Sequence, residues 1–407
     1  MARRTRLNPN LTLADGVATF PKRDPRRLIA SEPIPTAVLQ PLRAALARRN
    51  VAQCRIAVIG DSTEEGQGVL PVTFDGRQYP WPERLGQLLR SKYPTDGLSN
   101  WSAPSWFAPQ STTTVANGWT NSGWSNTSYL GPDSKIMRSS VAGSTLTFTT
   151  PVGVTDLDFL YVGGSGVTGF TVAVDGGAAS AAIVQTGSVK DGYKYSINGL
   201  AAGSAHTIVI TSLGTNSFFD GMMAHYGSAS KGIQVFNFGR SGSKTGDYLP
   251  GGAFGDWIKS GTTTTSTLCG PQSWSAINPD LIIMGWGYND ANNSLTKAQF
   301  KANLATITAT LRIMLAPKVV PVIYLSKWAP NASWASGKPM NDYSQIVAAC
   351  AEAADEGTNT LALDLSQRIP AAQGSLSTAY GLHVDTVHGT NSGYQMIADD
   401  VFSALTA

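Results

Sequence analysis

The stretch Arg55-Ile56-Ala57-Val58-Ile59-Gly60-Asp61-Ser62 decides how this chain of 407 residues is interpreted. A short apolar run that breaks at a glycine is typical of a buried strand with a turn behind it. Open α/β sheets carry their functional side chains just beyond the carboxyl ends of such strands. Ser62 is therefore a candidate nucleophile, and the alternative is a serine that only caps the turn.

Other apolar runs repeat this arrangement later in the chain. Continuous apolar runs are typical of strands that are buried on both faces of a parallel sheet, and we predict such strands at 56–59, 233–238, 281–284, 319–325 and 360–365. Apolar residues at helical spacing predict helices at 36–49, 81–93, 300–314, 342–354 and 392–405. The alternation predicts a three-layer α/β/α domain around a doubly wound parallel sheet.

A different texture separates the first strand from the later ones. Residues 98–229 are rich in Thr, Ser, Gly and Asn, and 144–149 alternate polar with apolar residues. Asp175-Gly176 after an alternating strand is a hairpin signal. We therefore expect an inserted all-β sandwich or jelly-roll domain at 98–229, within an α/β domain formed by 51–97 and 230–407. Residues 1–50 are predicted to form a basic N-terminal arm and a helix.

The composition argues against several classes of function. Lys and Arg number 30 against 27 Asp and Glu, which is too small an excess to predict a nucleic-acid partner. Cys54, Cys269 and Cys350 form no CxxC pair, so neither a disulfide framework nor a zinc site is predicted. No glycine-rich phosphate loop stands in its required context. We expect no cofactor and no metal.

The sequence also bears on location. It has no run of about 18 apolar residues, so no membrane-spanning helix is expected. Residues 1–6 have the charge of a secretory signal without the apolar stretch that follows one. We expect that the Sec route does not export the chain as given, and that it is extracellular or virion-associated rather than cytoplasmic.

Three further motifs follow predicted strands or precede the last helix: Asn237-Phe238-Gly239-Arg240-Ser241-Gly242, Gly287-Tyr288-Asn289-Asp290 and Asp385-Thr386-Val387-His388. Together with Gly60-Asp61-Ser62 they resemble the blocks of the SGNH (GDSL-type) hydrolase family. The resemblance covers about residues 53–95 and 230–405. It implies a flavodoxin-like α/β/α fold and hydrolysis of an acyl ester through a serine, with Gly242, Asn289 and His388 in the second, third and fifth blocks.

The choice of a general base is narrow because the chain has only four histidines. His206 and His225 belong to the inserted region. His388 has Asp385 three residues before it, close enough within one turn for the carboxylate to orient the imidazole. The family resemblance implies that both residues come from this loop. His383, in the same loop, is the alternative base.

An oxyanion that forms during ester hydrolysis needs hydrogen-bond donors. Three donors are plausible: the backbone N–H of Ser62, the backbone N–H of Gly242 and the side-chain amide of Asn289. A glycine suits a backbone donor because no side chain blocks close approach. The family resemblance selects Gly242 over Gly239 for this role.

The neighbours of these residues are expected to be structural. Asp61 is predicted to hydrogen-bond its own loop and shape the turn, and Asp290 to stabilise the loop that follows the third strand. Glu64 and Glu65, beside the candidate nucleophile, are expected to be solvated.

Four tryptophans in the inserted region, at 101, 106, 119 and 124, are a hint of the substrate class. Indole faces can stack on sugar rings, and packing in a protein core is the alternative role. Trp119 and Trp124 are expected to be the most exposed of the four, because Asn and Gly flank them. They are the candidate substrate-binding residues.

These patterns predict a metal-independent serine esterase that removes an acyl group, most plausibly acetyl, from a cell-surface or plant polysaccharide or a glycoconjugate. The bulky Trp286 and Tyr288 in the third block are expected to narrow the acyl pocket. One alternative is a virion or surface glycan-binding protein that uses the hydrolase fold as a scaffold. A lipase or thioesterase of the same family is another.

Overall fold

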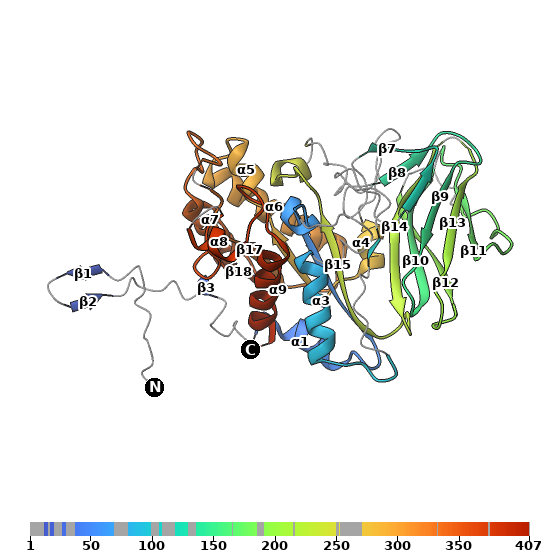
Figure 1. Cartoon of the computed structure of the whole chain (residues 1–407), viewed down its shortest axis with the longest axis horizontal. Helices are drawn as coiled ribbons and strands as arrows, with labels where there is room; N and C mark the ends of the chain where they lie inside the picture. The colour runs from blue at the N-terminus through green and yellow to red at the C-terminus, as the bar shows by residue number, and fades with distance from the viewer. Residues whose placement is uncertain are drawn as a thin grey trace.

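The computed structural model combines an α/β unit with a set of antiparallel strands (Figure 1). It describes residues 12–14, 17–19, 27–29, 37–68, 80–98, 106–107, 119–128, 136–164, 166–184, 191–214, 216–249, 252, 271–331, 333–372 and 375–406. Within this part of the chain, none of the helices combines the length and the apolar character that crossing a bilayer requires.

A parallel sheet forms the centre of the α/β unit. Its strands, in spatial order, are β15 (Gly232–Gly239), β4 (Gln53–Gly60), β16 (Leu281–Gly285), β17 (Val322–Ser326), β18 (Thr360–Asp364) and β3 (Arg27–Ile29). The first five follow the strand order of flavodoxin-like folds, in which the chain reverses direction beside the first strand. Sites in such sheets lie at the carboxyl ends of the strands next to this reversal, which here are β15, β4 and β16.

Helices cover both faces of this sheet. One face is covered by α1 (Gln40–Ala47), α3 (Trp81–Lys92) and α9 (Asn391–Thr406), and the other by α4 (Pro271–Ile277), α6 (Lys297–Leu315) and α7 (Tyr343–Glu356). Successive side chains of a strand point to opposite faces. In β4, Ile56 and Val58 pack against the first group and Ala57 and Ile59 against the second. The three-layer α/β/α prediction is confirmed.

Capping residues explain where two of these helices begin. Thr296 precedes α6, and its hydroxyl accepts a hydrogen bond from the Gln299 backbone N–H while the Gln299 side chain accepts from the backbone of Thr296. This reciprocal cap starts the helix three residues before the predicted position. Asp342 caps α7 through the Ser344 backbone N–H, at 2.9 Å.

The N-terminal region contains more structure than the predicted arm and helix. Two short strands, β1 (Thr12–Ala14) and β2 (Val17–Thr19), form an antiparallel pair that lies at the left of Figure 1. The third, β3, pairs in parallel with β18 and becomes an edge strand of the central sheet. The sequence did not predict that β3 pairs with β18, because a strand of three residues is too short to show the alternation of a strand.

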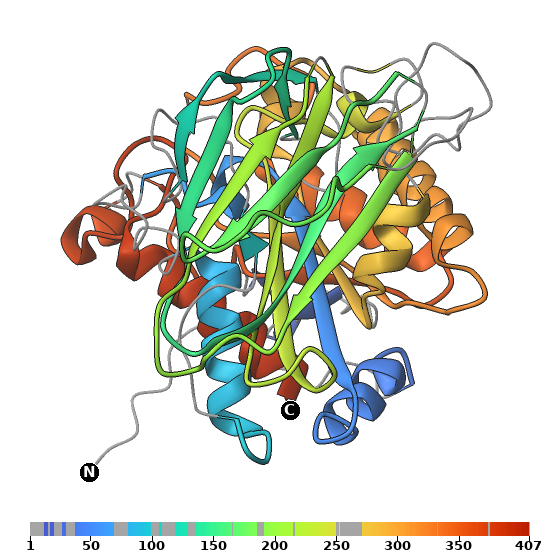
Figure 2. The same cartoon turned by 90° about the vertical axis from the view of Figure 1, so that its right-hand side faces the viewer.

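Two antiparallel sheets lie between α3 and β15 in the chain and face the viewer in Figure 2. One contains β6 (Trp119–Ser122), β9 (Thr145–Thr149), β11 (Phe170–Val174) and β13 (Thr207–Ser212). The other contains β5 (Trp106–Phe107), β7 (Trp124–Ser128), β8 (Ile136–Ser139), β10 (Val154–Gly163), β12 (Asp191–Asn198) and β14 (Ser217–Tyr226). They fit the predicted inserted β module, whose exact limits at 98 and 229 stay a prediction.

The two sheets share one apolar core, and the module also packs on the α/β unit. Side chains of both sheets belong to the same buried cluster. At the seam, Trp106 of β5 meets Phe238 of β15 edge to face, with ring centroids 5.2 Å apart. Helix α4 packs against β12.

The expectation that Trp119 and Trp124 are exposed is wrong. Only 2% of Trp119 and 5% of Trp124 is accessible to solvent, and the Trp119 ring lies 4.8 Å from that of Phe148 and 5.4 Å from that of Phe219. The polar residues 120–122 continue strand β6, and only Gly123 separates it from β7 of the other sheet, so each strand directs its indole into the shared core. Trp106 is buried as well, and Trp101 lies outside the described residues.

We predict that Trp119→Ala destabilises the module by about 3–5 kcal/mol, because it removes a buried indole that contacts both sheets. Thr120→Ala is the matched control, since Thr120 is the exposed neighbour in the same strand. Denaturant unfolding of both variants measures the difference. A loss of stability no larger for Trp119→Ala than for the control would contradict the core assignment.

Candidate active site

Three neighbouring strands end in a glycine at the same level of the sheet. Gly60 of β4 pairs with Gly239 of β15 on one side and with Gly285 of β16 on the other. A Cβ atom on Gly60 or Gly285 would overlap the Glu64 carboxylate, and one on Gly239 would overlap the backbone of Glu65. Glycine is required at these strand ends because the chain after β4 folds back directly onto them.

Ser62 is the first residue of α2 (Ser62–Glu65), which follows β4. The Asp61 carboxylate accepts a hydrogen bond from the Thr63 backbone N–H, and the Glu64 carboxylate accepts one from the Asp61 backbone N–H, each at 2.9 Å. This reciprocal cap closes the turn around the serine. The predicted structural role of Asp61 is confirmed. About 6% of the Ser62 surface remains exposed.

The Ser62 hydroxyl begins a continuous line of hydrogen-bonding groups. Its Oγ lies 2.7 Å from His388 Nε2, and His388 Nδ1 lies 2.7 Å from Asp385 Oδ2. An ionised carboxylate can only accept, so Nδ1 carries a proton and the neutral ring has a free lone pair at Nε2. This arrangement leaves Nε2 able to accept the serine proton.

The Asp385 carboxylate is held by its own loop. Its Oδ1 accepts hydrogen bonds from the backbone N–H groups of Val387 and His388, both at 2.7 Å. Partial burial disfavours the charge, but these backbone bonds and the imidazole outweigh it and hold the pKa of Asp385 below its ordinary value. The carboxylate therefore stays ionised at neutral pH and can orient the ring.

The loop that carries His388 is also anchored from outside. The indole N–H of Trp328 donates to the carbonyl of Val387 at 2.8 Å. The backbone N–H of Asn331 donates to the carbonyl of Thr386 at 2.9 Å. Both donors belong to the segment that follows β17. The position of the imidazole thus depends on the neighbouring strand connection.

The other histidines have different partners. His383 Nδ1 lies 2.6 Å from Ser377 Oγ, and its ring meets Trp328 edge to face with centroids 4.5 Å apart. Burial lowers the pKa of His383 to about 4, so it is neutral at physiological pH. His206 and His225 lie in the β module, paired with Asp175 and Asp158. The geometry favours His388 over the alternative base, His383.

The candidate oxyanion donors come from the ends of three strands. Ser62 starts a helix, so its backbone N–H has no partner within that helix. Gly242 follows β15 with φ +77°, which favours glycine, and a Cβ there would meet no atom within 4 Å. The Asn289 amide donates to the carbonyl of Ser243 at 3.0 Å and has a second N–H to offer. Gly239, by contrast, lies beneath α2.

Asp290 joins two of these segments. One of its oxygens, Oδ1, accepts hydrogen bonds from the Thr245 backbone N–H, at 2.9 Å, and from the Thr245 hydroxyl. Its other oxygen, Oδ2, is buried without a hydrogen-bond partner among the described residues. Burial raises the pKa of Asp290 to about 7. The predicted structural role of this residue agrees with these contacts.

The expectation that Glu64 and Glu65 are solvated is wrong for Glu64. This residue has no exposed surface, and its carboxylate is paired with the ammonium of Lys327, which lies 2.9 and 3.0 Å from the two oxygens. The Glu65 carboxylate, which is partly buried, accepts from the Ser241 backbone N–H. The sequence contained one feature that could have indicated a partner for Glu64: Lys327 stands directly after the apolar strand that ends at Ser326.

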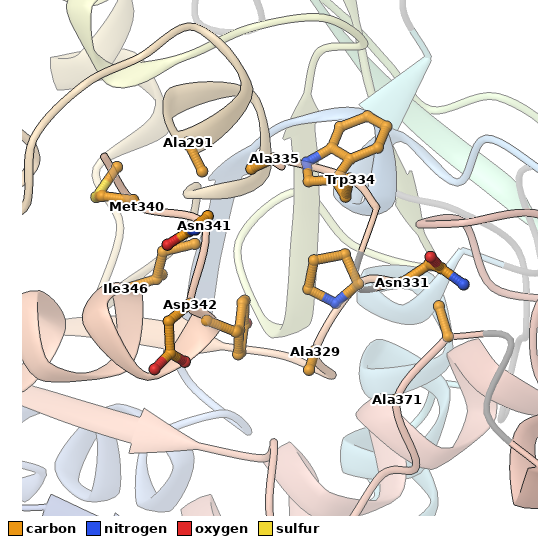
Figure 3. A pocket seen from close by; sticks show the side chains of 13 residues that line it. Ala291, Ala329, Asn331, Trp334, Ala335, Met340, Asn341, Asp342, Ile346 and Ala371 are labelled. Carbon is orange, nitrogen blue, oxygen red and sulfur yellow. The ribbon is translucent and has the colours of Figure 1, made fainter. Parts of the chain in front are cut away.

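A cavity of about 550 Å³ lies over the carboxyl ends of β17 and β18 (Figure 3). Its wall includes Ala291 of α5 (Tyr288–Asn292), two residues after Asn289, and Asn331, which is bonded to the His388 loop. Figure 3 shows Asn341 and Asp342 on the side of the cavity opposite Asn331. The cavity therefore adjoins both α5, which carries the candidate oxyanion donor Asn289, and the loop that carries the candidate base His388.

Two short helices complete the carboxyl edge of the sheet: η2 (Thr245–Tyr248) and α8 (Ser375–Tyr380). Within the described ranges, no group of three or more His, Cys, Asp or Glu side chains is arranged to hold a metal ion.

Comparison of the sequence gives one family match. A family model for GDSL-like lipase/acylhydrolase matches residues 188–401. That range contains Gly242, Asn289, Asp385 and His388, and Ser62 lies before it. No curated protein matches the chain by sequence.

Solved structures resemble the chain at low sequence identity. A peptidoglycan O-acetylesterase shares 14% identity at a TM-score of 0.61, over 92% of this chain and 97% of that one. A family two carbohydrate esterase from Clostridium thermocellum, in complex with cellohexaose, shares 12% at a TM-score of 0.32, over 70% and 97%. The one from Cellvibrio japonicus shares 11% at 0.32, over 71% and 94%. The first likeness shows that the fold of nearly the whole chain is shared.

We predict that Asp290→Asn flattens the dependence of stability on pH. The pKa of Asp290 is raised from 3.8 to about 7 by folding, so its contribution to stability is fully present below about 3.8 and is lost as the pH rises through about 7. Asparagine keeps the shape and has no such titration. The drop in Tm between pH 5 and pH 8 should be smaller in the variant than in the wild type.

Asp399→Asn, on the exposed side of α9, is the matched control for this measurement. It should leave the pH dependence of the wild type in place. Parallel Tm curves for the wild type and Asp290→Asn would contradict the assignment of a raised pKa to Asp290.

Proposed function

The chain belongs to the GDSL-like lipase/acylhydrolase family and is a carboxylic ester hydrolase, and from this premise we propose that it is a serine esterase that removes acetyl groups from a saccharide through an acyl-enzyme. The observation that carries the proposal is the line of hydrogen bonds from Ser62 through His388 to Asp385, with 2.7 Å at each step. A nucleophile, its base and the group that orients the base are the parts that this chemistry requires.

In the proposed reaction, His388 Nε2 takes the proton of Ser62 as Oγ attacks the ester carbonyl. The negative charge on the carbonyl oxygen is stabilised by the backbone N–H groups of Ser62 and Gly242 and by the amide of Asn289. The imidazolium, stabilised by Asp385, then gives its proton to the leaving alcohol oxygen. This leaves an acyl group on Ser62 Oγ.

Deacylation repeats the same steps with water. His388 takes a proton from the water as its oxygen attacks the acyl carbonyl, and the oxyanion forms at the same three donors. The imidazolium then returns a proton to Ser62 Oγ as the carboxylic acid leaves. The two-step path avoids direct attack of water on the substrate ester.

A short acyl group is supported by the packing behind the oxyanion donors. Trp286 and Tyr288, on either side of Gly287, are both buried. The Trp286 indole donates to the Ser243 hydroxyl at 3.1 Å, and the Tyr288 hydroxyl donates to the carbonyl of Trp328 at 2.6 Å. We infer that these buried rings leave little room for a long acyl chain beside Asn289.

The cavity beside the site supports a saccharide as the alcohol part of the ester. Its volume of about 550 Å³ is within the roughly 300–1,000 Å³ of small-molecule sites. A sugar ring has an apolar face and a polar edge. The cavity offers the half-buried indole of Trp334 together with the polar side chains of Asn331, Asn341 and Asp342. The solved protein of similar fold is named for removing acetyl groups from peptidoglycan, which belongs to the same substrate class.

The alternative was a glycan-binding protein that uses the hydrolase fold as a scaffold without catalysis. The contacts of the tryptophans do not support it. Trp119 and Trp124 are core residues, so they offer no sugar-stacking surface. The uninterrupted hydrogen bonds of Ser62, His388 and Asp385 favour an active esterase.

We predict that Ser62→Ala and His388→Ala each lower kcat for p-nitrophenyl acetate by roughly a thousandfold or more while the protein stays folded. His383→Ala is the matched control, because His383 belongs to the same loop but bonds to Ser377, and it should retain most of the activity. Stopped-flow kinetics and circular dichroism measure both properties. Near wild-type turnover in Ser62→Ala would disprove the assignment of Ser62 as the nucleophile. Faster hydrolysis of octanoyl than of acetyl esters would disprove the assignment of acetyl as the acyl group.

The saccharide assignment is tested at Trp334. Trp334→Ala should raise KM for an acetylated oligosaccharide by roughly 2- to 10-fold more than for p-nitrophenyl acetate, the equivalent of about 0.5–1.5 kcal/mol of ring contact. Trp334→Phe is the control, because it also loses the indole bond to the Tyr288 carbonyl but keeps an aromatic face. Equal effects of Ala and Phe on both substrates would show that Trp334 only supports α5.

A further inference from the structure

A cluster of charges is buried directly behind the proposed nucleophile. Lys327 follows β17, and only 1% of its side chain is exposed. Its Nζ lies 2.9 and 3.0 Å from the two oxygens of Glu64 and 3.4 Å from Asp61 Oδ1. The same nitrogen donates to the hydroxyl of Thr63 and to the carbonyl of Gly285. One ammonium thus contacts four residues of two other segments.

Each of these contacts is with a segment of the candidate site. Asp61, Thr63 and Glu64 surround Ser62 in the sequence and form the turn that carries it. Gly285 ends the strand that leads to Asn289. The ammonium also lies over the ring of Tyr288, 4.8 Å from the centroid.

We propose that Lys327 is a positioning residue for the serine, which fixes the turn of Ser62 against the end of β16 and so directs the hydroxyl toward His388 and the oxyanion donors. This inference rests on the proposed role of Ser62 as the nucleophile. Lys327 acts through Glu64, Thr63 and the backbone.

Stability alone does not explain a buried ammonium at this position. A buried ion pair is often no more stabilising than apolar side chains of the same volume, because both charges lose their hydration. An ammonium does have three N–H donors, arranged tetrahedrally about Nζ. Here the donors reach Thr63, Glu64 and Gly285, so they specify the distance between two strand ends. An apolar side chain could fill this space without specifying that distance.

The charge balance supports the same role. Burial raises the pKa of Glu64, and the charge of Lys327, as the strongest influence in the opposite direction, favours the ionised carboxylate. Without the ammonium, Glu64 would take up a proton more readily. One of its oxygens would then carry a hydrogen and could no longer act only as an acceptor for the Asp61 backbone N–H and the Thr63 hydroxyl.

The first test is Lys327→Met, which keeps an unbranched side chain, one atom shorter than that of lysine, and removes the donors. A displacement of about 1 Å costs roughly a hundredfold in rate. The burst of p-nitrophenolate from p-nitrophenyl acetate, which measures acylation of Ser62, should therefore slow about 100-fold while KM changes little. Lys318→Met is the matched control, since Lys318 pairs with Asp280 at the opposite edge of the sheet, at 2.9 Å, and is partly exposed. It should acylate at the wild-type rate.

A second variant separates positioning from charge balance. Lys327→Met alone leaves Glu64 without its counter-ion and could unfold the protein. The double variant Glu64→Gln/Lys327→Met removes both charges, so its Tm should exceed that of the single variant. Its acylation should nevertheless stay about 100-fold slow, because the three donors are still missing.

Wild-type acylation in the single or the double variant would overturn the positioning role. A serine-directed fluorophosphonate provides the separate check on the proposed function. Failure of the reagent to label Ser62 in the wild-type protein would overturn the nucleophile and this inference together. Normal labelling of the wild type with unchanged acylation in the variants would overturn this inference alone.

Discussion

The buried pair of Glu64 and Lys327 is the interaction on which the arrangement of this site depends. Removing one member of such a pair leaves a charge that has lost its hydration, which costs about 3–5 kcal/mol. The Glu64 carboxylate can reach its position only because Gly60 and Gly285 have no side chains. The glycines, the carboxylate and the ammonium therefore form one constraint: the chain after β4 must fold back onto the sheet, and it must do so beside β17.

The groups of the proposed reaction are arranged around that constraint. Asp61 and Glu64 close the turn of Ser62, Asp290 ties α5 to the loop that follows Gly242, and the segment after Lys327 holds the loop of His388. Each group is held by hydrogen bonds that are already formed. An oxyanion site with preorganised donors does not have to reorganise when charge develops, which is why such sites stabilise a transition state better than water does.

The inserted β module has a different relation to the site. Its indoles at 119 and 124 fill the space between two sheets, and Trp106 packs on Phe238 of the central sheet. These three tryptophans therefore stabilise the fold by packing in its interior, and they do not form a surface for substrate. The polar and aromatic lining that suits a saccharide belongs instead to the α/β unit, in the cavity beyond β17 and β18. Substrate recognition is thus proposed for the connections of the same sheet that carries the nucleophile.

The sequence by itself determined the fold class and the candidate catalytic residues. Continuous apolar runs can be buried only with helices on both faces, and motifs directly after such runs must meet at one edge of the sheet. It could not determine the surroundings of Glu64 and Trp119. A glutamate two residues after a serine and a tryptophan in the stretch Asn117-Gly118-Trp119-Thr120-Asn121 both look solvent-exposed when only their neighbours in the chain are considered. Only the tertiary structure brings Lys327 to Glu64, from 263 residues away, and places Phe148 and Phe219 around Trp119. Burial depends on contacts between distant segments, and local sequence contains no record of them.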